Sequence, residues 1–245
     1  MRDISNYTDN YYRYKFEEQQ VLYRRKQILE IMERYSPGSV LEIGCGSEPL
    51  FRYYNCKYTI VEPSLDFANH AKSLITNDME VSVINDFFEN VAENFYDEHF
   101  DMIVCSALLH EVLDPINLMK CIYRVADEDT ITHINVPNAY SIHRILAYEA
   151  GLIDDLEQLS ESNVRFQQGR VFSKESLKHM AINVGFYIVD AGSYFVKPFT
   201  HRQMLFLLES GMIDEKILQG LYKLIKYIPE YGSEIYVNMR KVVNE

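Results

Sequence analysis

The chain has 245 residues, which is enough for one large α/β domain with a substantial core. Its 24 Lys and Arg against 36 Asp and Glu give a formal net charge of −12. Because an acidic surface repels phosphate backbones, this balance argues against broad nucleic-acid binding. A hydrophobic content of 47% with 24% charged residues excludes a disordered chain.

The four cysteines are widely spaced and contain no C-x-x-C pair, so neither a zinc site nor another metal site is expected. The first residues lack the apolar segment of a secretory signal peptide. The longest apolar runs are also far shorter than the ~20 residues that a membrane span needs. We therefore expect a reduced, cytoplasmic enzyme without membrane association.

Residues 13–34 carry apolar side chains on one helical stripe and are followed by Ser36-Pro37-Gly38, so a helix is predicted there. Further along, short apolar runs alternate with amphipathic stretches. The runs predict seven strands, at 40–43, 58–61, 81–84, 102–105, 130–136, 187–191 and 235–239. The stretches predict helices, at 64–76, 115–126, 173–184, 201–210 and 214–227. This alternation predicts an α/β fold with a doubly wound, mostly parallel seven-stranded sheet covered by helices on both faces.

Two long segments, 138–172 and 197–231, interrupt the alternation. Segments of this length are often lids or binding loops, although helices that only extend the core are the alternative. We predict an N-terminal helical lid over 1–36 and a main domain over 37–245 that contains both segments as helical insertions. The tyrosine-rich start, including Tyr14, would then cover the substrate; a packed helix with solvated tyrosines fits the pattern equally well.

A glycine turn follows the first predicted strand, and carboxylates follow the second and third, at the positions where a nucleoside could bind. The first strand runs into a turn in which Gly44 permits a sharp change of direction and Gly46 lets a ligand approach bare backbone. Glu62 ends the second strand and can accept hydrogen bonds from both hydroxyls of a ribose. After the third strand, Asp86 offers a carboxylate for an adenine amine and Phe87 offers an aromatic face.

The residues after this turn help to decide between two classes of cofactor. A dinucleotide needs a third glycine, because its pyrophosphate rests on the amino end of the following helix. Here that position is Pro49, and Glu48 would place a negative charge beside the phosphates. The turn therefore disfavours NAD and FAD and favours a cofactor without phosphate that carries a cationic sulfonium.

The segment Glu42-Ile43-Gly44-Cys45-Gly46 resembles the first motif of the class I, Rossmann-like S-adenosylmethionine-dependent methyltransferases. Residues 100–106 and 109–115 resemble their fourth-strand motif and the segment after it. The resemblance covers about residues 38–136, and it departs from many members at Ser47-Glu48-Pro49, where they carry another glycine. It implies that S-adenosylmethionine binds here and leaves as S-adenosylhomocysteine. The cofactor-binding residues that it implies are Glu42, Gly44, Cys45, Gly46, Glu62, Pro63, Asp86, Phe87 and Ser106.

Methyl transfer to a hydroxyl gains from a general base, typically 10²–10⁴-fold. The candidate catalytic bases are His110, after the fourth strand, and His143, after the fifth; a packed or capping side chain is the alternative for His110. The segment 136–144 is similar to stretches of sugar and surface-polysaccharide methyltransferases, which implies that His143 and Arg144 face the substrate. The candidate substrate-binding residues are Asn138, Arg144, Arg170 and Tyr14. The two arginines can hold a phosphate or carboxylate in bidentate fashion, or form surface ion pairs instead.

We favour an O-methyltransferase that acts on a small polar metabolite, such as a nucleotide-linked sugar or another polysaccharide precursor. The alternatives are an N- or C-methyltransferase of a quinone or natural product, and a non-catalytic scaffold that retains the cofactor fold. Ser106-Ala107-Leu108 stands where DNA and protein-glutamine methyltransferases often carry Asn/Asp-Pro-Pro-aromatic, which argues against a nucleic-acid partner. Apolar faces within 201–227 could form a homodimer interface.

Overall fold

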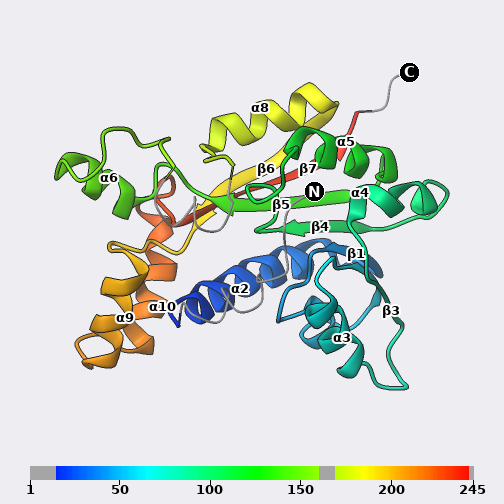
Figure 1. Cartoon of the computed structure of the whole chain (residues 1–245), viewed down its shortest axis with the longest axis horizontal. Coiled ribbons are helices and arrows are strands. Elements are labelled where there is room, and N and C mark those ends of the chain that lie inside the picture. The colour runs from blue at the N-terminus through cyan, green and yellow to red at the C-terminus, as the bar shows by residue number, and fades with distance from the viewer. Residues whose placement is uncertain (1–14, 160–168, 243–245) are drawn as a thin grey trace.

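The computed structural model describes residues 15–159 and 169–242, so the start of the predicted lid, with Tyr14, lies outside the described residues. One seven-stranded sheet runs through this part in the order β3-β2-β1-β4-β5-β7-β6 (Figure 1). The strands are β1 (Ser39–Ile43), β2 (Lys57–Val61), β3 (Val81–Ile84), β4 (Met102–Ser106), β5 (Ile131–Pro137), β6 (Phe186–Tyr194) and β7 (Glu234–Lys241). All seven predicted strands are present, and the doubly wound α/β fold is confirmed.

Strand direction decides which strand ends face the site. Strands β1 to β5 pair in parallel, whereas β7 pairs antiparallel with both β5 and β6. Strand β6 consequently runs in the same direction as β5. The carboxyl ends of six strands and the amino end of β7 therefore share one edge, which is where ligands bind in open α/β sheets.

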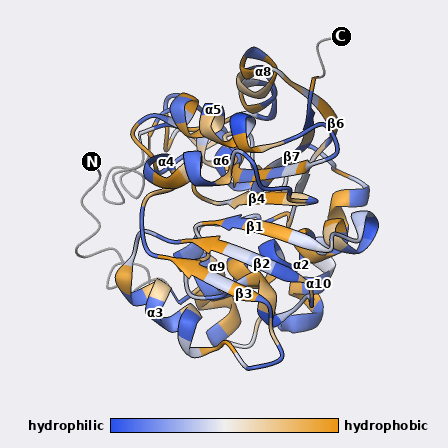
Figure 2. Cartoon of the chain, turned by 90° about the vertical axis from the view of Figure 1, so that its right-hand side faces the viewer, coloured by the Kyte–Doolittle hydropathy of each residue, from blue (hydrophilic) through white to orange (hydrophobic). Residues whose placement is uncertain are grey.

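Helices cover both faces of the sheet, and the buried side chains of β4 alternate between them. Met102 and Val104 belong to the core formed with α2 (Glu17–Tyr35) and α3 (Leu65–Ser73). Ile103 and Cys105 belong to the opposite core, formed with α4 (Phe88–Val91), α5 (Pro115–Val125) and α8 (Lys174–Val184). Figure 2 shows hydrophobic colour along the strands and hydrophilic colour over much of the outer helices. Short 3₁₀ turns lie at Leu50–Arg52, Ala92–Phe95 and Leu224–Lys226.

In their described residues, the two insertions carry the helices α6 (Ile142–Glu149), α9 (His201–Glu209) and α10 (Glu215–Lys223). The first insertion was predicted to be helical, but its pattern gave no bounds for α6, whose apolar stretch is short and whose side chains are not fully buried. A third apolar core joins α9 and α10 to the amino end of α2, through buried aromatic residues such as Phe16 and Phe195. This packing holds the amino end of α2 beside the edge of the sheet where the parallel strands end. No helix in the described ranges is long and apolar enough to cross a membrane.

Candidate functional site

A cavity of about 1020 Å³ opens at the edge where the strands end. On one side it is lined by the Gly44–Gly46 turn, by the start of the loop after β2 and by the segment after β4. On the other side the lining comes from the amino end of α2, from α6, from residues 197–202 and from the start of β7. The cavity thus joins the predicted cofactor site to both insertions.

The glycine turn presents bare backbone to the cavity, as the sequence predicts. Gly44 has φ 76° and Gly46 has φ 57°, both in the left-handed region that glycine adopts without strain. A Cβ on Gly44 would lie 3.2 Å from the Leu108 side chain, so that position is also closely packed. A Cβ on Gly46 would meet no atom within 4 Å, which leaves open space over this residue.

Glu62 lies at the floor of the cavity with its carboxylate held in place. The side chain is 4% exposed, and the carboxylate accepts hydrogen bonds from the backbone N–H groups of Ser64 at 2.8 Å and Gly46 at 3.1 Å. Burial raises the pKa of this carboxyl group, and the two backbone donors oppose the rise. The backbone and side chain of Cys45 also act on this carboxyl group as hydrogen-bond donors and lower its pKa. The carboxylate lines the cavity, where hydroxyl donors of a ligand can reach it.

Glu42, predicted to bind the cofactor, lies behind the turn and does not line the cavity. It is buried, accepts the Leu50 N–H at 3.0 Å and lies 3.9 Å from Arg25 of α2. Burial raises the pKa of Glu42 to about 7. Arg25 in turn donates to the carbonyl oxygen of Cys45 at 2.8 Å. Glu42 therefore holds the turn in place through Leu50 and Arg25, on the side away from the cavity, whereas Cys45 is part of the lining.

Only some residues of the predicted adenine site line the cavity. Phe87 and Pro63 line it, but Asp86 does not. The Asp86 carboxylate accepts hydrogen bonds from the Phe87 N–H and from the Asn90 side chain, both at 2.7 Å. Both bonds use its Oδ1 atom and hold the start of α4 (Phe88–Val91). Ser106 lines the cavity, and its buried hydroxyl has no hydrogen-bond partner in the described part of the chain. Because buried polar groups are usually hydrogen-bonded, this hydroxyl is available to a ligand.

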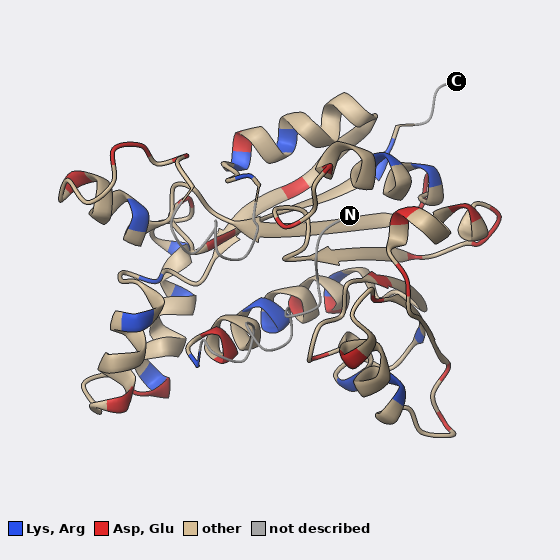
Figure 3. Ribbon diagram, viewed as in Figure 1, with Lys and Arg blue, Asp and Glu red and all other residues tan. Residues whose placement is uncertain are grey.

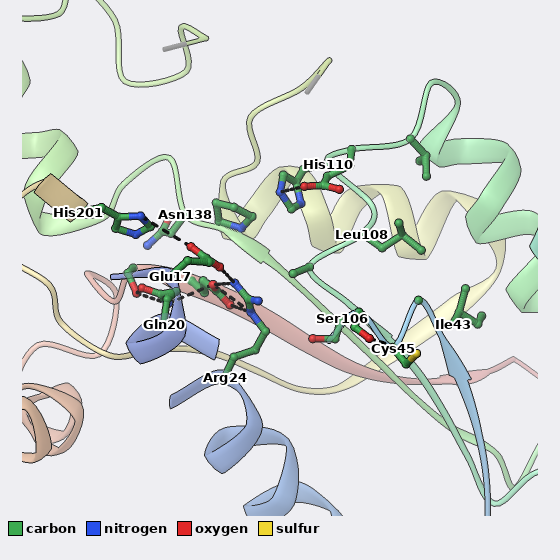
Figure 4. Close-up of a pocket in the computed structure, with 18 of the residues that line it drawn as sticks. Glu17, Gln20, Arg24, Ile43, Cys45, Ser106, Leu108, His110, Asn138 and His201 are labelled. Carbon is green, nitrogen blue, oxygen red and sulfur yellow. Dashed lines mark hydrogen bonds and ion pairs between the residues drawn. The ribbon is translucent and has the colours of Figure 1, made fainter. Parts of the chain in front are cut away.

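His110 lies between the two halves of the cavity (Figure 4). It is 6% exposed and comes from the segment that connects β4 to α5. Its Nε2 atom lies 3.8 Å from a carboxylate oxygen of Glu111. In Figure 4, Ser106 and Leu108 lie on one side of His110 and Glu17 and Arg24 on the other.

A buried polar network that the sequence analysis missed forms the far wall of the cavity. Arg24 donates from Nε to both carboxylate oxygens of Glu234, at 2.9 and 3.1 Å, and lies 3.2 Å from Glu17. Gln20 donates to Glu234 at 3.0 Å, and the Tyr194 hydroxyl also donates to this carboxylate. Gln20 and Arg24 are four residues apart on one face of α2, a spacing that could have indicated a polar helix face turned inward.

Two of the predicted substrate-binding residues line the cavity and a third does not. Asn138 lines it, but its amide donates to the carbonyl oxygens of Glu230 and Gly232, at 3.0 and 2.9 Å. Arg144 also lines it, but the guanidinium donates to the carbonyl oxygens of Leu156 and Gln158. Both side chains therefore hold neighbouring loops in place. Arg170 is exposed and is not part of the lining.

Two further residues of the cavity, Lys197 and His201, were missed by the sequence analysis, whereas His143 was predicted. Burial, with Lys197 nearby, holds the pKa of His143 and of His201 well below the usual range. Lys197 follows the carboxyl end of β6, so the same rule that selected His143 after β5 could have selected it. In the described ranges, no group of His, Cys, Asp and Glu residues could hold a metal ion.

Comparison with known proteins places the chain in a family. The sequence model of a methyltransferase domain family matches residues 16–191. A comparison with curated protein sequences found no relative. Similar solved structures include a methyltransferase from Thermotoga maritima described as a possible histamine N-methyltransferase (TM-score 0.61, 18% identity, 98% of this chain and 97% of that chain covered).

Two other structures have the same fold. One is the plantazolicin methyltransferase BamL (TM-score 0.60, 18% identity, covering 93% of this chain and 88% of that chain). The other is a putative methyltransferase from Bacillus halodurans (TM-score 0.57, 17% identity, covering 89% of this chain and 100% of that chain). Because the family match spans more than half of the chain, the protein belongs to this methyltransferase domain family and is an S-adenosylmethionine-dependent methyltransferase.

Proposed function

We propose that this enzyme methylates an oxygen atom of a small polar acceptor that binds beside the cofactor. The observation that carries the proposal is the two-part cavity, with a glycine turn and Glu62 on one side and a buried polar wall on the other. Its volume of about 1020 Å³ equals the upper end of the roughly 300–1,000 Å³ usual for ligand pockets, which leaves room for two molecules. A nucleotide-linked sugar is the first acceptor class that we propose.

Residues on the glycine side fit an adenosine that carries an amino-acid tail. Glu62 presents a carboxylate to the cavity that can accept from ribose hydroxyls, and Phe87 offers an aromatic face to an adenine. The unpartnered Ser106 hydroxyl and the open space over Gly46 remain for the rest of the molecule. When bound, S-adenosylmethionine supplies an electrophilic methyl group on a cationic sulfur.

His110 is the residue to which we assign proton transfer from the acceptor, because it lies where the two halves of the cavity meet. His143, the other base candidate, lies in the polar half, and its low pKa makes it a weak base at neutral pH. We therefore assign to His143 the orientation of the acceptor through a hydrogen bond.

Replacing His110 with glutamine is expected to lower kcat by about 10²–10⁴-fold, which is the usual contribution of a general base. Binding of S-adenosylhomocysteine, measured by isothermal titration calorimetry, is expected to stay unchanged, since the substitution keeps a polar side chain of similar length. The exposed His179 of α8 provides the matched control, H179Q, with unchanged kcat. Equal kcat values for H110Q and H179Q would remove His110 from the mechanism.

The acceptor class is tested with S-adenosylmethionine and a panel of nucleotide-linked sugars, sugar phosphates, small carboxylates, quinones and azole peptides, read by mass spectrometry. Azole peptides are included because a plantazolicin methyltransferase shares the fold. Methyl transfer to a hydroxyl of a sugar derivative supports the proposal. Cofactor binding with transfer only to nitrogen or carbon, or with no transfer to any member, contradicts it. The predicted homodimer is tested separately by light scattering.

A further inference from the structure

The polar half of the cavity contains a buried lysine, Lys197, that forms no ion pair within 4 Å in the described part of the chain. Arg24 and Glu234 form a bidentate pair, and Glu17 lies 3.2 Å from the same arginine. The donors of Arg144 are directed at backbone carbonyls. Lys197 remains, and among residues 15–159 and 169–242 neither its electrostatic neighbour Glu17 nor Glu234 comes within 4 Å of its ammonium group as an ion pair.

Lys197 is held in the cavity wall by the backbone on its amino-terminal side. The Phe195 carbonyl accepts the Ser233 N–H at 2.8 Å, and the Val196 N–H donates to the Leu221 carbonyl at 3.1 Å. Phe195 itself has φ 55°, a left-handed conformation that is rare outside glycine and turns the chain sharply after β6. The side chain of Lys197 is only 4% exposed and lines the cavity.

Burying an ammonium group costs several kcal/mol. Glu17 and Glu234 offset part of this cost at a distance, since both raise the pKa of Lys197, but neither forms a close ion pair with it in the described part of the chain. Burial lowers the pKa of Lys197 to about 8, which still leaves the side chain mostly protonated at neutral pH. Figure 3 shows basic residues on α2, α6 and α9, the helices that border this half of the cavity, and α2 also carries acidic residues in its first turn. Glu17 and Glu234 balance Arg24 and Lys197 in formal charge, so the preference for an anion comes from the contacts that Lys197 lacks and not from a net positive field.

The neighbours of Lys197 can add hydrogen bonds to such a group. His143 and His201 are held neutral, so each imidazole carries one N–H donor. The Nδ1 atom of His143 is buried and has no hydrogen-bond partner in the described part of the chain. The amino end of α9, where Thr200, His201 and Arg202 line the cavity, adds the positive end of a helix dipole.

We propose that the methyl acceptor carries an anionic group, a phosphate or a carboxylate, and that this group binds to the ammonium of Lys197 with a hydrogen bond from His143. The proposal rests on the proposed function, because it concerns the acceptor half of the same cavity. An amine acceptor is disfavoured there, since it would face Lys197 while Glu17 is already paired with Arg24. The anion would draw the acceptor toward α9 and leave its other end at His110.

The first test is a titration of the protein, saturated with S-adenosylhomocysteine, with four simple probes followed by NMR chemical shifts. Inorganic phosphate and pyrophosphate form the phosphate arm, and acetate and malonate form the carboxylate arm. We expect the probes of at least one arm to bind the wild type. K197M is expected to weaken that binding at least tenfold, whereas K197R is expected to retain most of it. The matched control is K216M, because Lys216 is exposed on α10 and does not line the cavity.

The second test uses the wild type alone, so that it does not depend on how the variants fold. Reductive methylation with formaldehyde and cyanoborohydride, located by peptide mass, is expected to be at least fivefold slower at Lys197 when the binding probe is present, with no change at Lys216. No binding of any probe, equal binding by K197M and the wild type, or no protection of Lys197 overturns the proposal. If S-adenosylhomocysteine still binds in that case, the proposed function stands without it; if S-adenosylhomocysteine itself fails to bind, the proposed function falls.

Discussion

Replacing Glu62 with alanine is expected to weaken the binding of S-adenosylhomocysteine by about 10- to 150-fold. Hydrogen bonds to a charged group contribute roughly 1.5–3 kcal/mol, and a factor of ten in affinity corresponds to about 1.4 kcal/mol. The loss has two sources. E62A removes the acceptor of the ribose hydroxyls, and it also removes the hydrogen bonds that hold the N–H groups of Gly46 and Ser64 in place. Isothermal titration calorimetry measures the change directly.

Glu48 supplies the control for this variant. It lies in the loop after β1, two residues from Gly46, does not line the cavity, and is paired with Arg52 at 2.6 Å on the surface. E48Q is expected to bind S-adenosylhomocysteine as the wild type does. E62Q, which keeps one acceptor oxygen, is expected to fall between E62A and the wild type. Affinity of E62A equal to that of E48Q would show that the ribose is bound elsewhere.

Replacing Arg24 with methionine is expected to lower the free energy of unfolding by about 3–5 kcal/mol, because it leaves the Glu234 carboxylate buried without its partner. For a domain of this size that corresponds to a fall in Tm of roughly 6–20 °C. The methionine keeps most of the side-chain volume, so loss of the charge is the main change. Differential scanning calorimetry at neutral pH measures the effect.

The pH dependence of this effect follows from the pKa of Glu234. Burial alone would raise it, but the charge and hydrogen bonds of Arg24, with the Tyr194 hydroxyl, hold it below its usual value. A carboxyl group with a lowered folded-state pKa stabilises the fold above its unfolded pKa, and this contribution is lost as pH falls through the folded-state pKa. The Tm difference between the wild type and R24M is therefore expected to be largest near neutral pH and to shrink in acid.

Arg34 offers a matched control on the same helix. Its ion pair with Asp190, at 3.1 Å, is exposed, and exposed pairs contribute only about 0–1 kcal/mol. R34M is expected to change Tm by no more than a few degrees. The double variant R24M/E234Q removes both charges and is expected to recover part of the loss. Similar Tm values for R24M and R34M would mean that the buried pair contributes little.

The cofactor side of the site could be predicted from sequence because its parts are local. The glycine turn, Glu62 and Phe87 each follow directly after an apolar strand, and parallel strands bring such residues to one edge. Asp86 and Glu42 have the expected positions in sequence but bind backbone and neighbouring side chains instead of facing the cavity. Side-chain direction at a strand end depends on the loop that follows, which the apolar pattern does not describe.

The acceptor side was decided by the tertiary structure. Arg24 and Glu234 are 210 residues apart in the chain, and they meet because β7 is antiparallel and begins at the edge where the other strands end. Lys197 joins them because the third apolar core holds α9 and α10 against α2. The sequence alone determined the fold and the glycine turn, since these depend on short local patterns, and the enzyme class was implied by the resemblance of its motifs to a known family. The acceptor pocket required long-range packing, since its charged groups come from distant segments whose contacts no local pattern records.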